Sequence, residues 1–157
     1  MAMGTDSFPP DLIRGIDVGV HAANARFGHG SADVSQYIDA ATTGGAAALN
    51  RRDLGTIEPG ATADFTAFSL SDFRDGVHDD PLRTLVLAGT GRNAVFSMVA
   101  GQTVMRDGMI PGIGLDKLRA EAQAVFEKLR EGYAVRDPLG RSADEIFPPT
   151  FPLEPSC

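Results

Sequence analysis

Residues 53–64 read Asp53-Leu54-Gly55-Thr56-Ile57-Glu58-Pro59-Gly60-Ala61-Thr62-Ala63-Asp64, and the character of the sequence changes around them. Glu58-Pro59-Gly60 is a strong turn signal, because proline presets the backbone for a turn and glycine tolerates left-handed conformations. Upstream of Arg51 the apolar residues recur at helical spacing, whereas short segments that favour strands follow the turn. This stretch therefore marks the boundary between a helical region and a β region.

The segment after the turn predicts a small antiparallel β region over residues 51–113. Its predicted strands are residues 63–70, 84–88, 94–100 and 103–106. Gly101-Gln102 separates the last two, and a two-residue loop that begins with glycine suits a hairpin with a type II′ turn. Asp107-Gly108 marks the turn that follows.

The segment before the boundary predicts two successive helices. In the first, residues 11–27, apolar side chains recur every three or four positions, and Asp11 is the predicted cap. Gly15 and Gly19 lower its helix propensity and are interpreted as points of close packing against a neighbouring element. Two helices that pack against a strand end are consistent with the closing part of an α/β barrel.

The second helix is predicted to begin at Ser31, with Asp33 in its first turn. The run Thr42-Thr43-Gly44-Gly45 should end it, and another short helical segment is expected over residues 46–49. A third helix, over residues 115–133, shows the clearest apolar stripe of the chain. The proline-rich tail after residue 136 is expected to run as an extended strap with docked phenylalanines.

The composition excludes several classes of protein. The chain has 157 residues, 43% of them hydrophobic, and a formal net charge of −7, which argues against nucleic-acid and anionic-membrane partners. Its single cysteine, Cys157, excludes a disulfide framework and a cysteine-rich zinc site within the chain. Neither a signal peptide nor a membrane-spanning stretch is recognisable. We expect a cytoplasmic protein that binds neither nucleic acid nor membranes.

One carboxylate near the start of the chain is a candidate catalytic group. Gly4-Thr5-Asp6-Ser7 predicts the end of a strand that turns into a helix, and that end of a barrel strand commonly holds a metal ligand or general base. Taken alone, an Asp in such a turn more often caps a helix or closes an Asx-turn. Imidazole partners would have to come from upstream, so the chain is expected to begin where an active site would be completed.

The histidines do not form a recognisable ligand set. His21 lies on a predicted helix, His29 lies between glycines, and no His-x-His or His-Glu-x-x-His is present. His78 precedes Asp79-Asp80, where a loosely held cation is a weaker hypothesis than a solvated acidic loop. No serine nucleophile elbow and no phosphate loop occur either.

Three blocks of the sequence together resemble the amidohydrolase superfamily. Residues 53–64 are similar to the stretch that leads, in that family, out of a metal-dependent barrel into a small β-sandwich. Residues 40–49 look like the preceding helix, and residues 95–108 match the closing strands. Asn50, and Ala61-Thr62, depart from the commonest residues of the family but are interpreted as tolerated turn substitutions.

Within the superfamily, the segment from Gly4 to Asp11 and the Phe147-Pro148-Pro149 tail resemble the branch of triazine hydrolases and of cytosine, guanine and 8-oxoguanine deaminases. The resemblance implies hydrolysis of a C–N or C–Cl bond of a small nitrogen heterocycle with one divalent metal, usually Zn²⁺. It implies that Asp6 contacts the metal and accepts a proton from the attacking water. The histidine ligands of the family would lie upstream of Met1.

The expected fold class is therefore α/β. Residues 1–50 would be the last strand and helices of a TIM barrel, residues 51–113 strands of the β-sandwich, and residues 114–157 a terminal helix and strap. One carboxylate does not hold catalytic zinc, so the isolated chain is predicted to be inactive and not to retain the metal by itself.

Two alternatives stay open at this point. The chain could be one subunit of a split hydrolase whose histidines come from a separate polypeptide. It could instead be a non-catalytic folded or oligomeric module, for which self-association would be expected because an incomplete barrel exposes strand edges and an apolar face.

Overall fold

The computed structural model describes residues 1–6, 10–77 and 79–151. The chain divides into two compact units, Met1–Pro111 and Gly112–Cys157. No helix in the described part of the chain is both long and apolar enough to cross a membrane.

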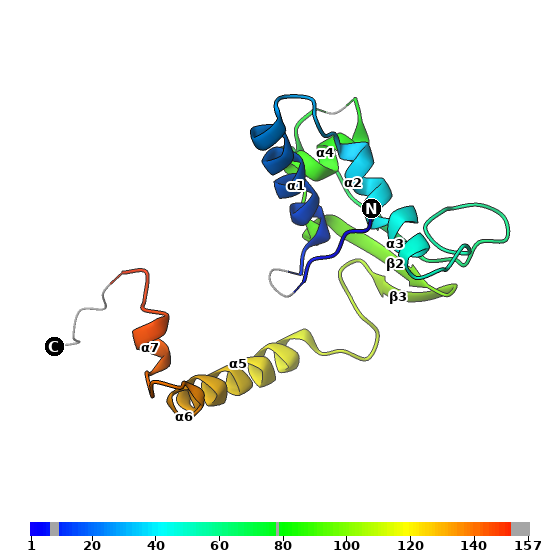
Figure 1. Ribbon diagram of the computed structural model, residues 1–157. Coiled ribbons are helices and arrows are strands. Elements are labelled where there is room, and N and C mark those ends of the chain that lie inside the picture. The colour runs from blue at the N-terminus through cyan, green and yellow to red at the C-terminus, as the bar shows by residue number, and fades with distance from the viewer. Residues whose placement is uncertain (7–9, 78, 152–157) are drawn as a thin grey trace. The chain divides into compact units, whose positions relative to one another are not determined.

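Three helices of the first unit share its core, and Figure 1 shows them side by side: α1 (Leu12–Phe27), α2 (Val34–Ala41) and α4 (Pro81–Ala88). Ile16 and Val86 are 1% exposed, and Val20 is buried with them. Removing these side chains from water stabilises the unit, by about 1.5–3 kcal/mol for each large aliphatic group. The core therefore joins the amino-terminal helices to a helix much later in the chain.

The first helix confirms its prediction. The Asp11 carboxylate accepts the Arg14 N–H at 3.2 Å and caps α1. A Cβ atom added at Gly19 would lie 2.5 Å from the Tyr37 ring, and the Tyr37 hydroxyl donates to the Gly19 carbonyl at 2.9 Å. Close packing thus explains a helix-weakening glycine at this position.

The second helix begins at Val34, three residues later than predicted. Asp33 precedes it as a cap, and Gln36 reciprocates in a capping box. The Ser31 hydroxyl instead donates to the Ala23 carbonyl at 3.2 Å, which ties the connecting loop back to α1. The short helix α3 (Thr43–Ala48) follows α2 with Thr42 between them.

The sheet of the first unit has three antiparallel strands in the order β1 (Phe65–Phe68), β2 (Ala94–Val99) and β3 (Gln102–Arg106). The predicted hairpin is present, but its loop is Ala100-Gly101, and Gln102 already belongs to β3. Both loop residues have positive φ, 47° and 76°, which is the requirement of a type I′ turn and not of the predicted type II′ turn. The Asp64 carboxylate accepts the Ala100 N–H at 2.6 Å and holds this conformation.

The predicted strand over residues 84–88 is wrong, because these residues form the second half of α4. Asp80 caps the helix by accepting the Arg83 N–H at 3.1 Å, and Pro81 occupies the first helical position, where its missing N–H costs nothing. Two 3₁₀ turns, η1 (Phe73–Asp75) and η2 (Gly91–Asn93), flank α4.

The strand predicted to precede Asp6 is also not formed, since residues 1–6 belong to no helix or strand. A barrel strand needs hydrogen-bonded neighbours, and in the described part of the chain the sheet consists of β1, β2 and β3. The segment is held instead by the Met3 N–H, which donates to the Ala40 carbonyl at 3.1 Å.

The second unit contains α5 (Leu115–Glu131), α6 (Tyr133–Arg136) and α7 (Ala143–Ile146). The long helix confirms its prediction, ending two residues early. The tail is not simply extended, because Ser142 and Glu145 form a capping box that starts α7. Phe147 packs edge-on against Tyr133 at 5.8 Å, whereas Phe151 is 79% exposed and residues 152–157 lie outside the described part.

Candidate functional site

Asp6 lies on the surface of the first unit, in a left-handed backbone conformation with φ of 58°. This conformation is uncommon for a residue other than glycine, although Asp tolerates it better than most. The Met3 side chain, three residues earlier, packs on the core of Ile16, Val20 and Val86. The carboxylate is therefore exposed at the end of a segment whose beginning is fixed to the core.

A second fixed point follows Asp6 at the start of α1. One oxygen of Asp11 accepts both the Arg14 N–H, at 3.2 Å, and the Gly91 N–H, at 2.9 Å. This carboxylate thus joins the first turn of α1 to η2, which lies 80 residues further along the chain. Ser7, Phe8 and Pro9 lie between the two fixed points and outside the described residues.

The structure does not assemble a metal centre from the residues it describes. No group of three His, Cys, Asp or Glu side chains in residues 1–6, 10–77 and 79–151 is arranged to hold an ion. His21 contacts Asp17 at 3.2 Å one turn away on α1, and His29 is exposed in the following loop. His78, the third histidine, and Cys157 lie outside the described residues, so the weaker hypothesis of a cation beside Asp79 and Asp80 stays a prediction.

Residues 53–64, the stretch that resembles the family signature, do not form a reaction centre. Asp53 and Thr62 of this stretch form a hydrogen-bonded cluster with Arg51, which we call the clasp. Arg51 donates two hydrogen bonds to the Asp53 carboxylate, at 2.7 and 2.6 Å, and the Thr62 hydroxyl donates to it at 2.7 Å. These donors, Arg51 first, hold the pKa of Asp53 far below its ordinary value, so that the clasp is charged. Gly55, with φ of 87°, passes against the backbone of Thr42 and Thr43. The stretch therefore fastens the loop before β1 to the end of α2.

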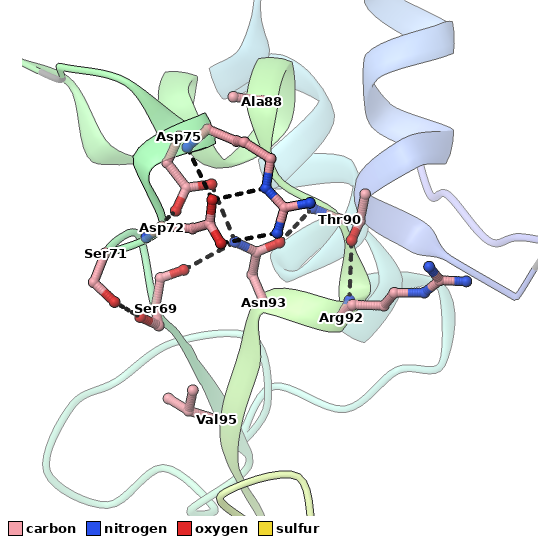
Figure 2. Close-up of a pocket in the computed structure, with 10 residues that line it drawn as sticks. Ser69, Ser71, Asp72, Asp75, Ala88, Thr90, Arg92, Asn93 and Val95 are labelled. Carbon is pink, nitrogen blue, oxygen red and sulfur yellow. Dashed lines mark hydrogen bonds and ion pairs between the residues drawn. The ribbon is translucent and has the colours of Figure 1, made fainter.

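Sequence reasoning missed a hollow of the first unit that has a volume of about 660 Å³. Figure 2 shows its polar lining, contributed by the turns on either side of α4 and by the start of β2. At its base Asp75 is 7% exposed and accepts the Asp72 N–H at 3.0 Å and the Asn93 amide at 3.3 Å. Asn93 also donates to the Ser69 carbonyl at 3.0 Å.

The polar side chains that line this hollow form hydrogen bonds and an ion pair with one another. Arg74 forms a two-pronged ion pair with Asp72 at 2.8 Å, which lowers the pKa of that carboxyl, and Figure 2 shows Arg92 pointing away from the cluster. The Ser69 and Ser71 hydroxyls lie 2.7 Å apart, and among the residues that the structure describes neither is paired with a histidine base. The lining is therefore suited to locking the turns around α4 and not to nucleophilic chemistry. The Asp72/Asp75 and Thr90/Asn93 spacings are capping patterns, and they could have revealed the cluster in the sequence.

Comparison with known proteins identifies the family to which this chain belongs. The model of the amidohydrolase family matches residues 1–104, from the segment of Asp6 to the closing hairpin. A 5-methylthioadenosine/S-adenosylhomocysteine deaminase of Nitratidesulfovibrio vulgaris strain Miyazaki F is 30% identical over 147 residues, covering 80% of this chain and 33% of the relative. The hydroxydechloroatrazine ethylaminohydrolase of Pseudomonas sp. strain ADP is 34% identical over 104 residues, covering 66% of this chain and 21% of the relative.

A solved structure agrees with these relatives. The atrazine chlorohydrolase of Arthrobacter aurescens TC1, complexed with zinc, is 25% identical with a TM-score of 0.62, covering 72% of this chain and 26% of the other. The chain thus spans a third or less of the length of the proteins it matches. A match over residues 1–104, supported by a relative aligned to most of the chain, establishes that the chain belongs to the amidohydrolase family.

Proposed function

We propose that this chain is the carboxyl-terminal part of a metal-dependent amidohydrolase that hydrolyses a C–N or C–Cl bond of a nitrogen heterocycle. The support is the family match, together with relatives named for deaminating adenosine derivatives, removing ethylamine from a triazine and dechlorinating atrazine. In this proposal residues 1–50 close the barrel, residues 51–113 supply sandwich strands, and residues 114–157 form the terminal helix and strap. The catalytic activity belongs to the longer assembly.

Asp6 is the group that this part contributes to the reaction. The observation that carries the assignment is the family match over the segment that holds this exposed carboxylate. That segment is bracketed by the Met3 and Asp11 contacts. In the proposed reaction the Asp6 carboxylate accepts a proton from the attacking water.

The residues described here do not fit a complete metal site. Catalytic zinc usually takes three protein ligands and leaves a further position for water, and Asp6 is one carboxylate without an assembled ligand group around it. When bound in the longer assembly, a divalent metal would make water acidic enough to ionise near neutral pH. We expect the isolated chain neither to retain zinc nor to turn over substrate.

Complementation tests this proposal. The purified chain is mixed with the Pseudomonas ethylaminohydrolase from which the matching segment has been deleted, and amine release from hydroxydechloroatrazine is measured with and without zinc. We expect release only from the mixture. Asp6→Asn should lower it at least ~100-fold, because proton transfer by a positioned carboxylate contributes that much or more.

The matched control is Asp17→Asn, which removes a partly buried carboxylate elsewhere in the same unit and should leave the restored activity unchanged. Turnover by the isolated chain would show that it is not a part of a larger site. Equal activity of the Asp6→Asn mixture and the unmodified mixture would remove Asp6 from the reaction. No release from a mixture of two folded pieces would count against the assignment of the chain to this enzyme type.

A further inference from the structure

The Asp11 carboxylate does more than cap α1. One of its oxygens accepts the Arg14 N–H at 3.2 Å, which is the cap, and also the Gly91 N–H at 2.9 Å, across a sequence separation of 80 residues. The carboxylates that cap α2 and α4 accept their capping N–H from the residue three positions further along the chain. A helix cap therefore needs only a local bond, and the bond to Gly91 serves another purpose.

Gly91 is the first residue of η2, and an N–H at that position has no partner within its own turn. The Asp11 carboxylate supplies the missing acceptor. A Cβ atom added at Gly91 would lie 3.1 Å from the same Asp11 oxygen, closer than most Cβ contacts. The absence of a side chain therefore lets η2 approach the start of α1 closely enough to form the bond.

The turn η2 is itself fixed to the polar cluster shown in Figure 2. The side-chain oxygen of Asn93 accepts the Thr90 N–H at 2.9 Å. Its amide donates to the Ser69 carbonyl at 3.0 Å and to the Asp75 carboxylate at 3.3 Å. Asp75 is 7% exposed, and a buried polar network whose groups are hydrogen-bonded holds one arrangement. Through Gly91, the start of α1 is therefore joined to this cluster.

Asp6 lies between this hydrogen bond and the core of the first unit. On one side the Met3 N–H donates to the Ala40 carbonyl at 3.1 Å, and the Met3 side chain packs on the core. On the other side Asp11 follows Asp6 by five residues. With the function proposed above as the basis, we propose that Asp11 is a positioning residue for the reaction. Its bond to Gly91 fixes the start of α1 and thereby the place of the Asp6 carboxylate.

Three substitutions separate the helix cap from the bond to Gly91. Asp11→Ser retains a good cap, but its hydroxyl is shorter than a carboxylate by one bond and should not reach Gly91 as well. Asp11→Asn retains an oxygen in the place of the carboxylate oxygen and should preserve both bonds. Gly91→Pro removes the donor from the other side, and proline is tolerated at the first position of a helix.

Kinetics of the complementation mixture described above test this role, with the chain added to saturation so that weaker assembly does not lower the rate. Asp11→Ser and Gly91→Pro should each lower kcat for hydroxydechloroatrazine at least about tenfold and leave KM unchanged. A misplaced catalytic group loses transition-state stabilisation but not substrate binding. Asp11→Asn should retain most of the kcat. The control is Asp33→Ala, which removes the cap of α2 and should lower the unfolding temperature without changing kcat.

Three kinetic results would overturn the proposal. An unchanged kcat in Asp11→Ser would show that Asp11 only caps α1. A raised KM with an unchanged kcat would place Asp11 in substrate binding instead. An equal loss of kcat in Asp11→Asn would assign the effect to the charge of Asp11 and not to its bond with Gly91.

Nuclear magnetic resonance of the full chain gives a readout that does not depend on the proposed function. In Asp11→Ser the Gly91 amide should exchange faster and the ¹³Cγ signal of Asp6 should shift, whereas Asp11→Asn and Asp33→Ala should leave both unchanged. Faster exchange at Gly91 without a shift at Asp6 would overturn the proposal. A mixture of unmodified pieces that releases no amine would instead count against the proposed function, and these two signals would still show whether Asp11 holds Asp6 in place.

Discussion

Helices α1 and α5 carry similar apolar stripes, but the stripe of α1 is more deeply buried than the stripe of α5. In α1 the stripe is covered by α2 and α4, so that Ile16 is 1% and Val20 7% exposed. In α5 the corresponding side chains stay about half-exposed. Periodicity therefore predicts that a helix forms and which face is apolar, whereas the partner of that face depends on residues far away in the sequence or in another molecule.

The largest expected effect comes from truncating the covered stripe. Ile16→Ala should lower the free energy of unfolding of the first unit by about 3 kcal/mol, because a buried cavity is left in addition to the lost apolar contact. Leu118→Ala, the matched change in α5, should lower the free energy of unfolding of the second unit by less than about 0.5 kcal/mol.

Tyrosine fluorescence during urea unfolding measures this difference. The chain has two tyrosines and no tryptophan. A Tyr133→Phe background leaves Tyr37, on α2, as the reporter of the first unit, and a Tyr37→Phe background leaves Tyr133, on α6, as the reporter of the second. Equal losses in Ile16→Ala and Leu118→Ala would show that the two stripes do not differ as the structure describes.

An intermediate effect is expected at the glycines of α1. Gly19→Ala should destabilise the first unit by about 1–2 kcal/mol, because the new methyl group would meet the Tyr37 ring at 2.5 Å. Gly15→Ala is the matched control: its methyl group would lie 3.3 Å from the flexible end of Met3, which can shift. That variant should be stabilised by up to about 1 kcal/mol through helix propensity. The same urea experiment checks both, and destabilisation by both would mean that Gly15 is also tightly packed.

The errors of the sequence interpretation have the same origin as the contrast between α1 and α5. Residues 84–88 favoured a strand because a short apolar run looks alike in a strand and in a buried helix. The deciding signal, Asp80-Pro81, lies just before that run and caps α4. The capping residue Asp11 led to a correct helix prediction. The capping residue Asp80 was not used, and the strand predicted after it was wrong.

The candidate site shows the limit of such reasoning more clearly. Sequence could single out Asp6 as a carboxylate in a turn and could find the stretch from Asp53 to Asp64 as a family signature. It could not find the hollow of Asp75 and Asn93, since that cluster depends on turns brought together around α4. Nor could it show that the signature acts through an Arg51 and Thr62 clasp, which is a tertiary contact.

The smallest predicted effect concerns the turn after α6, which is held by the hydrogen bonds and the ion pair of Asp137. Asp137 accepts the Leu139 and Arg141 N–H groups at 2.9 and 3.0 Å, as well as the Arg141 guanidinium. The Arg141 side chain, followed by these backbone donors, lowers the pKa of Asp137 from 3.8 to about 2. Because the folded-state pKa is depressed, the stabilisation is complete above about pH 4 and is lost as the pH falls toward 2.

Amide hydrogen exchange at Leu139 and Arg141 measures this effect. Asp137→Asn should exchange faster than the unmodified chain at neutral pH, and the difference should shrink steadily below about pH 4 because the unmodified carboxyl becomes neutral as well. Asp116→Asn, in the first turn of α5, is the control and should leave these two amides unchanged. A difference that persists undiminished at pH 2 would mean that packing of Tyr133 on Phe147, and not the charge of Asp137, holds the turn. In that case the second unit would resemble the first in relying on apolar contacts.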